Sequence, residues 1–202
     1  MKPYDIVEEL EHRVAEYGGS KYAVAVDSCT NALLLCLKFH YMKNGKSYLE
    51  LPKKTYVGVA YAVINAGHGI LCFRNNDWEG SYEIGGTNII DSARRFRKGM
   101  YVKGSLYCLS GHWGKHLKIG RGGFILTDNQ DTALILRIMR FDGRTAGVAP
   151  ADDDFKYPGF HCYMLPEEAA RGLMLMNYIG EDNPDLPKDD YPDLSKFPIF
   201  RS

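Results

Sequence analysis

The sequence predicts an α/β fold, in which strands and helices alternate along the chain. Short apolar runs of strand length alternate along the chain with segments whose apolar residues recur at helical spacing. Small polar residues follow several of these runs, at the edge where open α/β sheets bind ligands. The chain has 202 residues, 45% of them hydrophobic and 25% charged, which is enough for a domain with a real core.

Charge and cysteine content exclude several classes of protein. The formal net charge is zero at pH 7, so there is no electrostatic argument for binding nucleic acid or an anionic membrane. No apolar run approaches the length of a transmembrane helix, and the N-terminus lacks the apolar stretch of a signal peptide. The five cysteines are scattered and form no CxxC pair, so we expect reduced thiols in a cytoplasmic protein.

The N-terminal segment predicts a helix, a strand and a second helix. Apolar residues recur every three or four positions over 5–17, and two glycines end this helix. Residues 21–26 form a short strand, after which Asp27 or Ser28 caps a helix that begins near Thr30. Because helix N-terminal N–H groups favour an anion, this turn is a candidate phosphate site. An ordinary helix cap with nothing bound is the alternative.

The rest of the chain continues this alternation and then changes character. Further strands are expected at 49–52, 69–73, 88–91, 104–109 and 124–127. Further helices are expected at 55–65, 131–140 and 166–178, with an acidic, proline-bounded loop at 149–158. After Gly180 the chain is rich in Asp, Pro and Lys. We therefore expect one domain over 1–180 and an extended C-terminal tail over 181–202.

A lysine between glycines is the strongest chemical signal. Lys115 lies in the loop 109–124, which ends with Gly122-Gly123 and an apolar run. Glycines permit close approach of the backbone to a ligand. Burial lowers the pKa of a lysine towards that of a nucleophilic amine. On spacing alone, a basic surface loop between two strands is the favoured alternative.

The same loop contains two histidines, His112 and His116, four residues apart. That spacing suits a metal ion when both residues lie on one helix. Gly111 and Gly114 argue against a regular helix, and no nearby acid completes a ligand set. We therefore expect no metal site.

The spacing around Lys115 resembles the signature of the DegT/DnrJ/EryC1/StrS family. Ser110 precedes the lysine by five residues, and Gly122-Gly123 begins seven residues after it. These are sugar aminotransferases that use pyridoxal 5′-phosphate on the fold-type-I scaffold. The resemblance implies an α/β fold in three layers, with a mostly parallel sheet and helices on both of its faces. The resemblance implies that Lys115 forms the Schiff base with the cofactor and that Ser110 contacts its phosphate. Lys118 competes for the lysine role, but it breaks the spacing to both motifs.

Three further segments resemble the family in the same order along the chain. Ser28-Cys29-Thr30 stands where the family has Ser-Gly-Thr, which implies a phosphate contact from Cys29 and Thr30. Tyr56 stands at the aromatic position that stacks on the cofactor ring. Asp91 opens a segment like the family's Asp-Ala-Ala, whose aspartate keeps the ring nitrogen protonated. Without the resemblance, these positions indicate a helix cap, a packed tyrosine and a turn residue.

The chain also departs from the family's pattern. Arg94 replaces a glutamine, and it fits either an anionic substrate group or a solvated basic run. His161 stands for an asparagine that reaches the cofactor phosphate of the partner subunit, and Tyr163 stands for an arginine. The resemblance runs from about residue 5 to 176, with the stretch 77–88 shortened. The family's C-terminal small domain has no counterpart, so a shortened member is expected.

The resemblance implies a pyridoxal 5′-phosphate-dependent aminotransferase of the nucleotide-sugar type. An amino acid would give its amine to a keto-sugar, and glutamate is the expected donor. Lys115 would be the acid–base residue, Asp91 would tune the ring, and a homodimer would share its active sites. One alternative is a protein of the same fold that binds this cofactor or another ligand but has lost transamination. A structural or partner-binding domain without cofactor is the third possibility, and the retention of both Lys115 and Asp91 argues for the enzyme.

Overall fold

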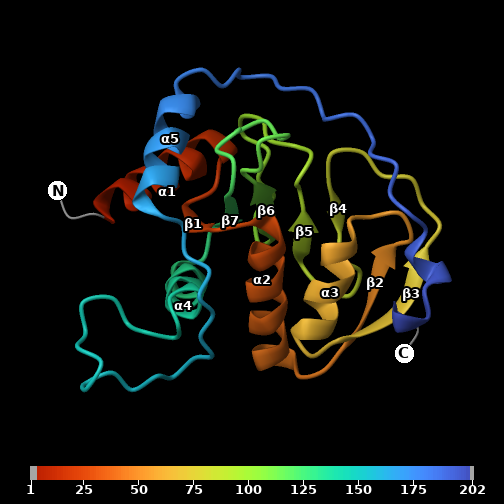
Figure 1. The fold of residues 1–202 in the computed structure, drawn as a ribbon, viewed down its shortest axis with the longest axis horizontal. Coiled ribbons are helices and arrows are strands. Elements are labelled where there is room, and N and C mark those ends of the chain that lie inside the picture. The colour runs from red at the N-terminus through yellow and green to blue at the C-terminus, as the bar shows by residue number, and fades with distance from the viewer. Residues whose placement is uncertain (1–3, 201–202) are drawn as a thin grey trace.

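The computed structural model describes residues 4–200 and confirms the α/β class (Figure 1). Its helices are α1 (Asp5–Gly18), α2 (Cys29–Asn44), α3 (Val57–Asn65), α4 (Gln130–Arg140) and α5 (Pro166–Met176). Its strands are β1 (Tyr22–Val26), β2 (Tyr48–Pro52), β3 (Gly69–Arg74), β4 (Tyr82–Glu83), β5 (Ile89–Asp91), β6 (Leu106–Ser110) and β7 (Gly123–Thr127). Within 4–200, none of the helices is long and apolar enough to cross a membrane.

The main sheet is mixed, which corrects the prediction of a mostly parallel one. Five strands lie in the order β1-β7-β6-β5-β4, and β2 and β3 form a separate parallel pair. Strand β6 is parallel to β5, but β7 is antiparallel to both of its neighbours and β4 is antiparallel to β5. The reason lies in the connections. The loop from β6 to β7 contains no crossover helix, and a short turn joins β4 to β5, so both pairs are antiparallel.

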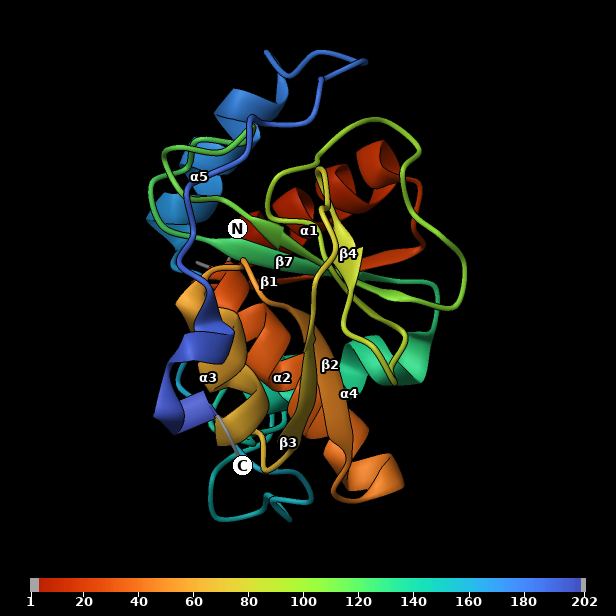
Figure 2. The ribbon, with the colours of Figure 1, turned by 90° about the vertical axis from the view of Figure 1, so that its right-hand side faces the viewer.

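Helices cover both faces of the sheet, as predicted. Along β1, Val24 and Val26 pack into the core formed with α2, α3 and α4, while Ala23 and Ala25 pack into the core formed with α1 and α5. This alternation follows from the two-residue period of a strand. Figure 2 shows α1 and α5 on one side of the strands and α2, α3 and α4 on the other.

The helix ends follow local sequence signals closely. Helix α1 ends at Gly18, and Gly19 takes the left-handed conformation with φ of 84°. Helix α2 begins one residue earlier than predicted, where the Ser28 side chain accepts a hydrogen bond from the Asn31 N–H at 3.2 Å. Helix α3 begins at Val57, two residues later than predicted, which leaves Tyr56 at the N-cap position. Strand β4 was not predicted, because it is too short to show a pattern.

A buried carboxylate ties α1 to the sheet and to α4. Glu11 is 2% exposed and accepts a hydrogen bond from the Ala25 N–H at 2.8 Å. It also pairs with Arg137 at 2.7 Å and with Arg140. Since these contacts join three elements, the carboxylate fixes the position of α1 against β1 and α4.

We expect Glu11→Gln to lower the free energy of unfolding by about 3–5 kcal/mol, because it leaves two guanidinium groups without their counter-ion. Urea denaturation at pH 7 measures the loss. The matched control is Glu9→Gln on the exposed face of the same helix, with an expected change within about 0.5 kcal/mol. Equal losses in the two variants would contradict a structural role for the buried cluster.

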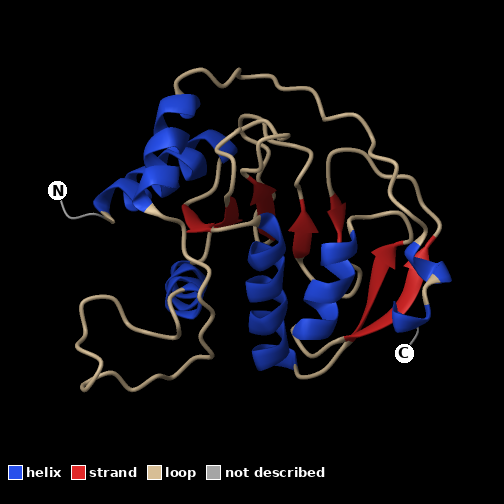
Figure 3. Cartoon of the chain, viewed as in Figure 1, coloured by secondary structure: helices blue, strands red, loops and turns tan. Residues whose placement is uncertain are grey.

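The C-terminal segment crosses the molecule after α5. Residues 181–192 contain neither helix nor strand and arch over the ends of the strands towards β3 (Figures 1 and 3). The segment is then anchored: the Leu194 N–H donates to the Lys53 carbonyl at 2.8 Å, and Leu194 and Phe200 are buried in the core beside α3. The chain therefore returns to the domain at its C-terminal end.

Candidate active site

A cavity of about 620 Å³ lies where β1, β5 and β6 end and α2 begins. These three strands run in one direction, so their carboxyl ends meet at one edge of the sheet. The predicted site residues that line the cavity are Cys29, Thr30, Tyr56, Asp91, Arg94, Ser110 and Lys115. The fold thus brings together residues that lie up to 86 positions apart in the sequence, as the numbers of Cys29 and Lys115 show (115 − 29).

Asp91 is the last residue of β5 and is 5% exposed. Its Oδ2 accepts a hydrogen bond from the Tyr82 hydroxyl at 2.9 Å, and its Oδ1 accepts one from the Ala93 N–H at 3.0 Å. Burial raises the pKa of Asp91 above its ordinary value. The two hydrogen bonds and the positive charges of Lys115 and Arg94 act in the opposite direction but are smaller.

Asp91 differs from the other buried acids in residues 4–200. Glu11 pairs with two arginines, and Asp27 pairs with Arg121 at 2.5 Å. Asp91 makes no ion pair with any residue that the structure describes, although it lines the cavity. A buried carboxylate without a counter-ion is costly. The cavity beside Asp91 is therefore suited to a ligand that presents a cationic group.

The loop that carries Lys115 is held against the start of α2. The Gly111 N–H donates to the Gly122 carbonyl at 2.8 Å, which closes the base of the loop. A β-carbon at Gly123 would lie 2.4 Å from the Ser28 carbonyl carbon, so only glycine permits this close approach. Lys115 makes no side-chain hydrogen bond or ion pair within the described part of the chain. Lys118 is exposed and does not line the cavity.

The turn before α2 presents a helix N-terminus to the same cavity. Asp27 accepts hydrogen bonds from Asn31 Nδ2 at 2.7 Å and from Arg121 at 2.5 Å, so its negative charge is compensated. Burial raises the pKa of the Cys29 thiol well above its ordinary value, which keeps this side chain neutral near pH 7. The Ser28 side chain takes the Asn31 N–H, so the N–H groups of Cys29 and Thr30 are the ones that the start of α2 offers to an anion.

Arg94 has a partner from the C-terminal segment. Its guanidinium is 3% exposed, pairs with Asp189 at 3.2 Å and donates to the Leu186 carbonyl at 3.1 Å. It also lies 5.5 Å from the centre of the Trp78 ring. The guanidinium that the sequence predicts for a substrate anion is thus already occupied by the chain's own carboxylate. Its role towards substrate stays a prediction.

The histidines lie apart from this arrangement. His161 is exposed, does not line the cavity and contacts Asp142 Oδ2 through Nδ1 at 2.9 Å. Its contact with a cofactor in a partner subunit stays a prediction. His116 contacts the Pro184 carbonyl through Nε2 at 2.9 Å. Among residues 4–200, no group of three or more His, Cys, Asp or Glu side chains is placed to hold a metal ion.

Sequence reasoning missed several residues of the cavity. Tyr82 reaches Asp91 because the antiparallel register of β4 and β5 pairs these two residues, and a two-residue strand leaves no pattern to read. Trp78 and Tyr191 come from segments without periodicity. For Arg121 there was a usable signal, since it is a cation between two glycines beside the lysine loop.

We expect Tyr82→Phe to lower the free energy of unfolding by about 1–3 kcal/mol, because it leaves buried polar groups without a partner. The lost hydroxyl lies 2.6 Å from Thr55 Oγ1 and 2.9 Å from Asp91 Oδ2. Urea denaturation at pH 7 measures the change, with the exposed Tyr178→Phe as control. If both variants unfold with the free energy of the wild type, the hydrogen-bond chain contributes nothing to stability.

Comparison with known proteins shows which family part of the sequence matches. Residues 1–72 match the DegT/DnrJ/EryC1/StrS aminotransferase family. This match confirms the resemblance to the family that the sequence motifs predicted. No curated protein matches the sequence of the chain.

Solved structures extend the likeness to most of the chain. The sugar aminotransferase CalS13 from Micromonospora echinospora has a TM-score of 0.70 at 16% identity, over 85% of this chain and 60% of its own. AtS13 from Actinomadura melliaura has a TM-score of 0.70 at 18% identity, over 85% and 59%. The GDP-4-keto-6-deoxymannose-3-dehydratase ColD has a TM-score of 0.67 at 16% identity, over 86% and 60%.

These likenesses establish the fold of the DegT/DnrJ/EryC1/StrS aminotransferases for this chain. The chain spans about 60% of the length of ColD and CalS13.

Proposed function

We propose that the protein is a pyridoxal 5′-phosphate-dependent aminotransferase of the nucleotide-sugar type. It would move an amine from an amino acid to a keto-sugar, and glutamate is the first donor to test. The observation that carries the proposal is the buried carboxylate of Asp91, which lacks an ion-pair partner among the described residues and lines the same cavity as Lys115. The protonated ring nitrogen of the cofactor is a cation that suits this carboxylate.

The residues present fit the cofactor at its other contact points as well. The first turn of α2, at Cys29 and Thr30, and the Ser110 hydroxyl suit the phosphate. Tyr56 offers an aromatic face to the ring. A β-carbon at Gly58 would lie 2.6 Å from the Tyr56 ring and 3.2 Å from Thr30 Oγ1, so glycine keeps the space between these two contacts open.

The chain's own side chains divide the chemistry between them. The cofactor, when bound, supplies an aldehyde that takes up an amine and a ring that withdraws electrons from the substrate carbon. Asp91 would hold the proton at the ring nitrogen, because a buried carboxylate favours a nearby positive charge. Lys115 would bind the aldehyde carbon and, once released, move the proton at the substrate carbon as general acid and base.

The solved relatives support the acceptor class. ColD was solved with bound GDP-perosamine, and CalS13 is a sugar aminotransferase. We therefore place a nucleotide-linked keto-sugar as the acceptor. A cofactor-binding protein that has lost transamination is the second candidate, and it is favoured by the pairing of Arg94 with Asp189.

The assembly and compartment belong to the same proposal. His161 is exposed and lies outside the cavity of its own chain, so it would reach a cofactor phosphate only across a homodimer that shares its active sites. All five cysteines are free thiols, which supports a cytoplasmic location. The zero net charge supports a small-molecule enzyme rather than a nucleic-acid or membrane-surface protein.

The visible spectrum of the purified protein with pyridoxal 5′-phosphate, before and after glutamate, tests the proposal. We expect a yellow band that glutamate bleaches, which establishes cofactor binding and the amine half-reaction. A band that no amino donor changes would favour the second candidate. The absence of a band at saturating cofactor would contradict both.

A further inference from the structure

The C-terminal segment is fastened to residues in and beside the Lys115 cavity. The Leu186 N–H donates to the Arg94 carbonyl at 2.9 Å, while the Arg94 side chain donates back to the Leu186 carbonyl at 3.1 Å. Asp185 accepts from Arg95 at 2.8 Å and from Arg97 at 2.8 Å. On the other side, the Pro184 carbonyl contacts His116 of the lysine loop. Figure 1 shows this segment passing over the strand ends.

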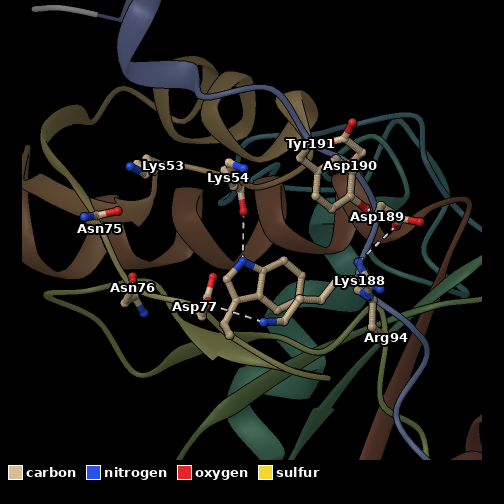
Figure 4. A pocket seen from close by; sticks show the side chains of 11 residues that line it. Lys53, Lys54, Asn75, Asn76, Asp77, Arg94, Lys188, Asp189, Asp190 and Tyr191 are labelled. Carbon is tan, nitrogen blue, oxygen red and sulfur yellow. Dashed lines mark hydrogen bonds and ion pairs between the residues drawn. The ribbon is translucent and has the colours of Figure 1, made fainter.

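Asp189 joins two cavity residues through one oxygen. Its Oδ2 lies 3.2 Å from Arg94 Nη1 and accepts a hydrogen bond from the Tyr191 hydroxyl at 2.7 Å. Figure 4 shows Arg94, Asp189 and Tyr191 side by side. Arg94 is 3% exposed, whereas Asp189 is 54% exposed. The buried guanidinium therefore depends on a carboxylate from the crossing segment, and that carboxylate in turn fixes the tyrosine.

Tyr191 faces the place where the cofactor and substrate are proposed to lie. It lines both the Lys115 cavity and a neighbouring cavity of about 480 Å³, which share Trp78 and Arg94. Its ring centre lies 6.4 Å from that of Tyr56, the residue predicted to contact the cofactor ring. Burial and the hydrogen bond to Asp189 raise the pKa of Tyr191, so its hydroxyl stays a donor at neutral pH.

We propose that Tyr191 is a specificity-determining residue of the Lys115 cavity and that Asp189 positions it by bridging to Arg94. The identity of the ligand rests on the proposed function. The bridge, meaning the contacts of Asp189 with Arg94 and Tyr191, is independent of that function. The chain then supplies its own substrate-side wall through Tyr191, the residue of the crossing segment that lines the cavity. The wall limits the size of the group beside the cofactor and shields that group from water.

Arg94 can either anchor Asp189 or bind an anionic group of the substrate. The two roles predict opposite effects of removing Asp189 on ligand binding. If Asp189 positions the wall, its loss loosens the segment and does not improve ligand binding. If Asp189 only occupies a substrate-anion site, its loss frees Arg94 and tightens the binding of an anionic ligand. The same variant therefore decides between them.

The first experiment is hydrogen exchange on the 202-residue protein without cofactor. We expect Asp189→Asn to speed exchange in residues 184–192 by about tenfold, the factor that loss of a hydrogen bond to a charged group gives. The Leu194 amide, bonded to Lys53, should stay protected and serves as an internal control. The matched variant is Asp190→Asn, whose carboxylate borders the neighbouring cavity and makes no ion pair or side-chain hydrogen bond within 4–200. Equal exchange in the two variants would overturn the positioning role.

The second experiment measures the size limit without needing turnover. The probes are reduced phosphopyridoxyl conjugates of alanine, glutamate and phenylalanine, titrated by calorimetry. We expect the wild type to prefer the alanine conjugate to the phenylalanine conjugate, and Tyr191→Ala to reduce this preference by about tenfold or more. Tyr191→Phe keeps the ring but loses the hydrogen bond to Asp189, so its preference should lie between those of the wild type and of Tyr191→Ala. Urea denaturation of both variants checks that a lost preference is not a folding defect.

The outcomes separate the inference from the proposed function. An unchanged preference in Tyr191→Ala, with normal binding by the wild type, would overturn the specificity role alone. Tighter binding of the glutamate conjugate to Asp189→Asn than to the wild type would make Arg94 a substrate-anion site and overturn the bridge. Failure of every conjugate to bind the wild type would contradict the proposed function, while the exchange experiment still decides whether Asp189 holds the segment.

Discussion

Lys115→Ala is expected to abolish the visible band of bound pyridoxal 5′-phosphate and to lower turnover by at least about 10⁴-fold, the upper range for a lost acid–base residue. The amine is the group in the cavity that can bind the aldehyde covalently and then move the proton. Since the Lys115 side chain makes no hydrogen bond or ion pair with the described residues, stability should change by less than about 0.5 kcal/mol. Cofactor titration and urea denaturation of the same preparation measure the two effects.

Lys118→Ala is the matched control for this variant. It removes the same charge three residues later in the same loop, from an exposed side chain outside the cavity. We expect it to keep both the band and the turnover of the wild type. A Lys115→Ala protein that retains the band, together with a Lys118→Ala protein that loses it, would move the cofactor lysine to Lys118.

The sequence predicted those features that depend on short stretches of chain. The end of α1 at Gly18-Gly19 and the start of α2 after Ser28 follow from glycine conformation and side-chain capping, which act over a few residues. The positions of Asp91 and Ser110 at strand ends were also predictable, because a resemblance in motif order indicated which strand each one ends. The structure then brings Asp91 and Lys115 to one cavity.

Features set by contacts between distant segments were not predictable. Tyr82 reaches Asp91 through the register of β4, and Asp189 reaches Arg94 from 95 residues further along the chain (189 − 94). No local period or cap encodes either contact. The mixed sheet was missed for a similar reason, since the direction of β7 depends on how the lysine loop turns back. The resemblance in motif order thus pointed to residues that line the cavity, while the contacts around them required the fold.

Asp91→Asn is expected to bind pyridoxal 5′-phosphate more weakly and to turn over about 10²–10³-fold more slowly, the range for loss of one preorganised electrostatic partner. An amide cannot balance the charge of a protonated ring nitrogen, although it has nearly the shape of the carboxylate. Tyr82 and Ala93 remain as its neighbours, so the change tests charge rather than packing. Stopped-flow bleaching by glutamate measures the rate, and unchanged turnover would show that Asp91 only ends its strand.

In the protein without cofactor, Asp91→Asn should instead increase the stability of the folded state. Burial raises the pKa of Asp91 above 3.8 in the folded state, so between the unfolded and folded pKa values the folded protein binds more protons than the unfolded one. Its stability therefore falls as the pH rises through that window, and the ionised carboxylate remains a cost at higher pH. Asparagine removes this cost, so the free energy of unfolding of Asp91→Asn relative to wild type should rise with pH and then level off. Saturating cofactor should make the wild type the more stable of the two proteins, because its Asp91 carboxylate gains a cationic partner and the asparagine does not. A difference that does not depend on pH, with or without cofactor, would mean that the Asp91 carboxylate is not the cofactor's counter-ion.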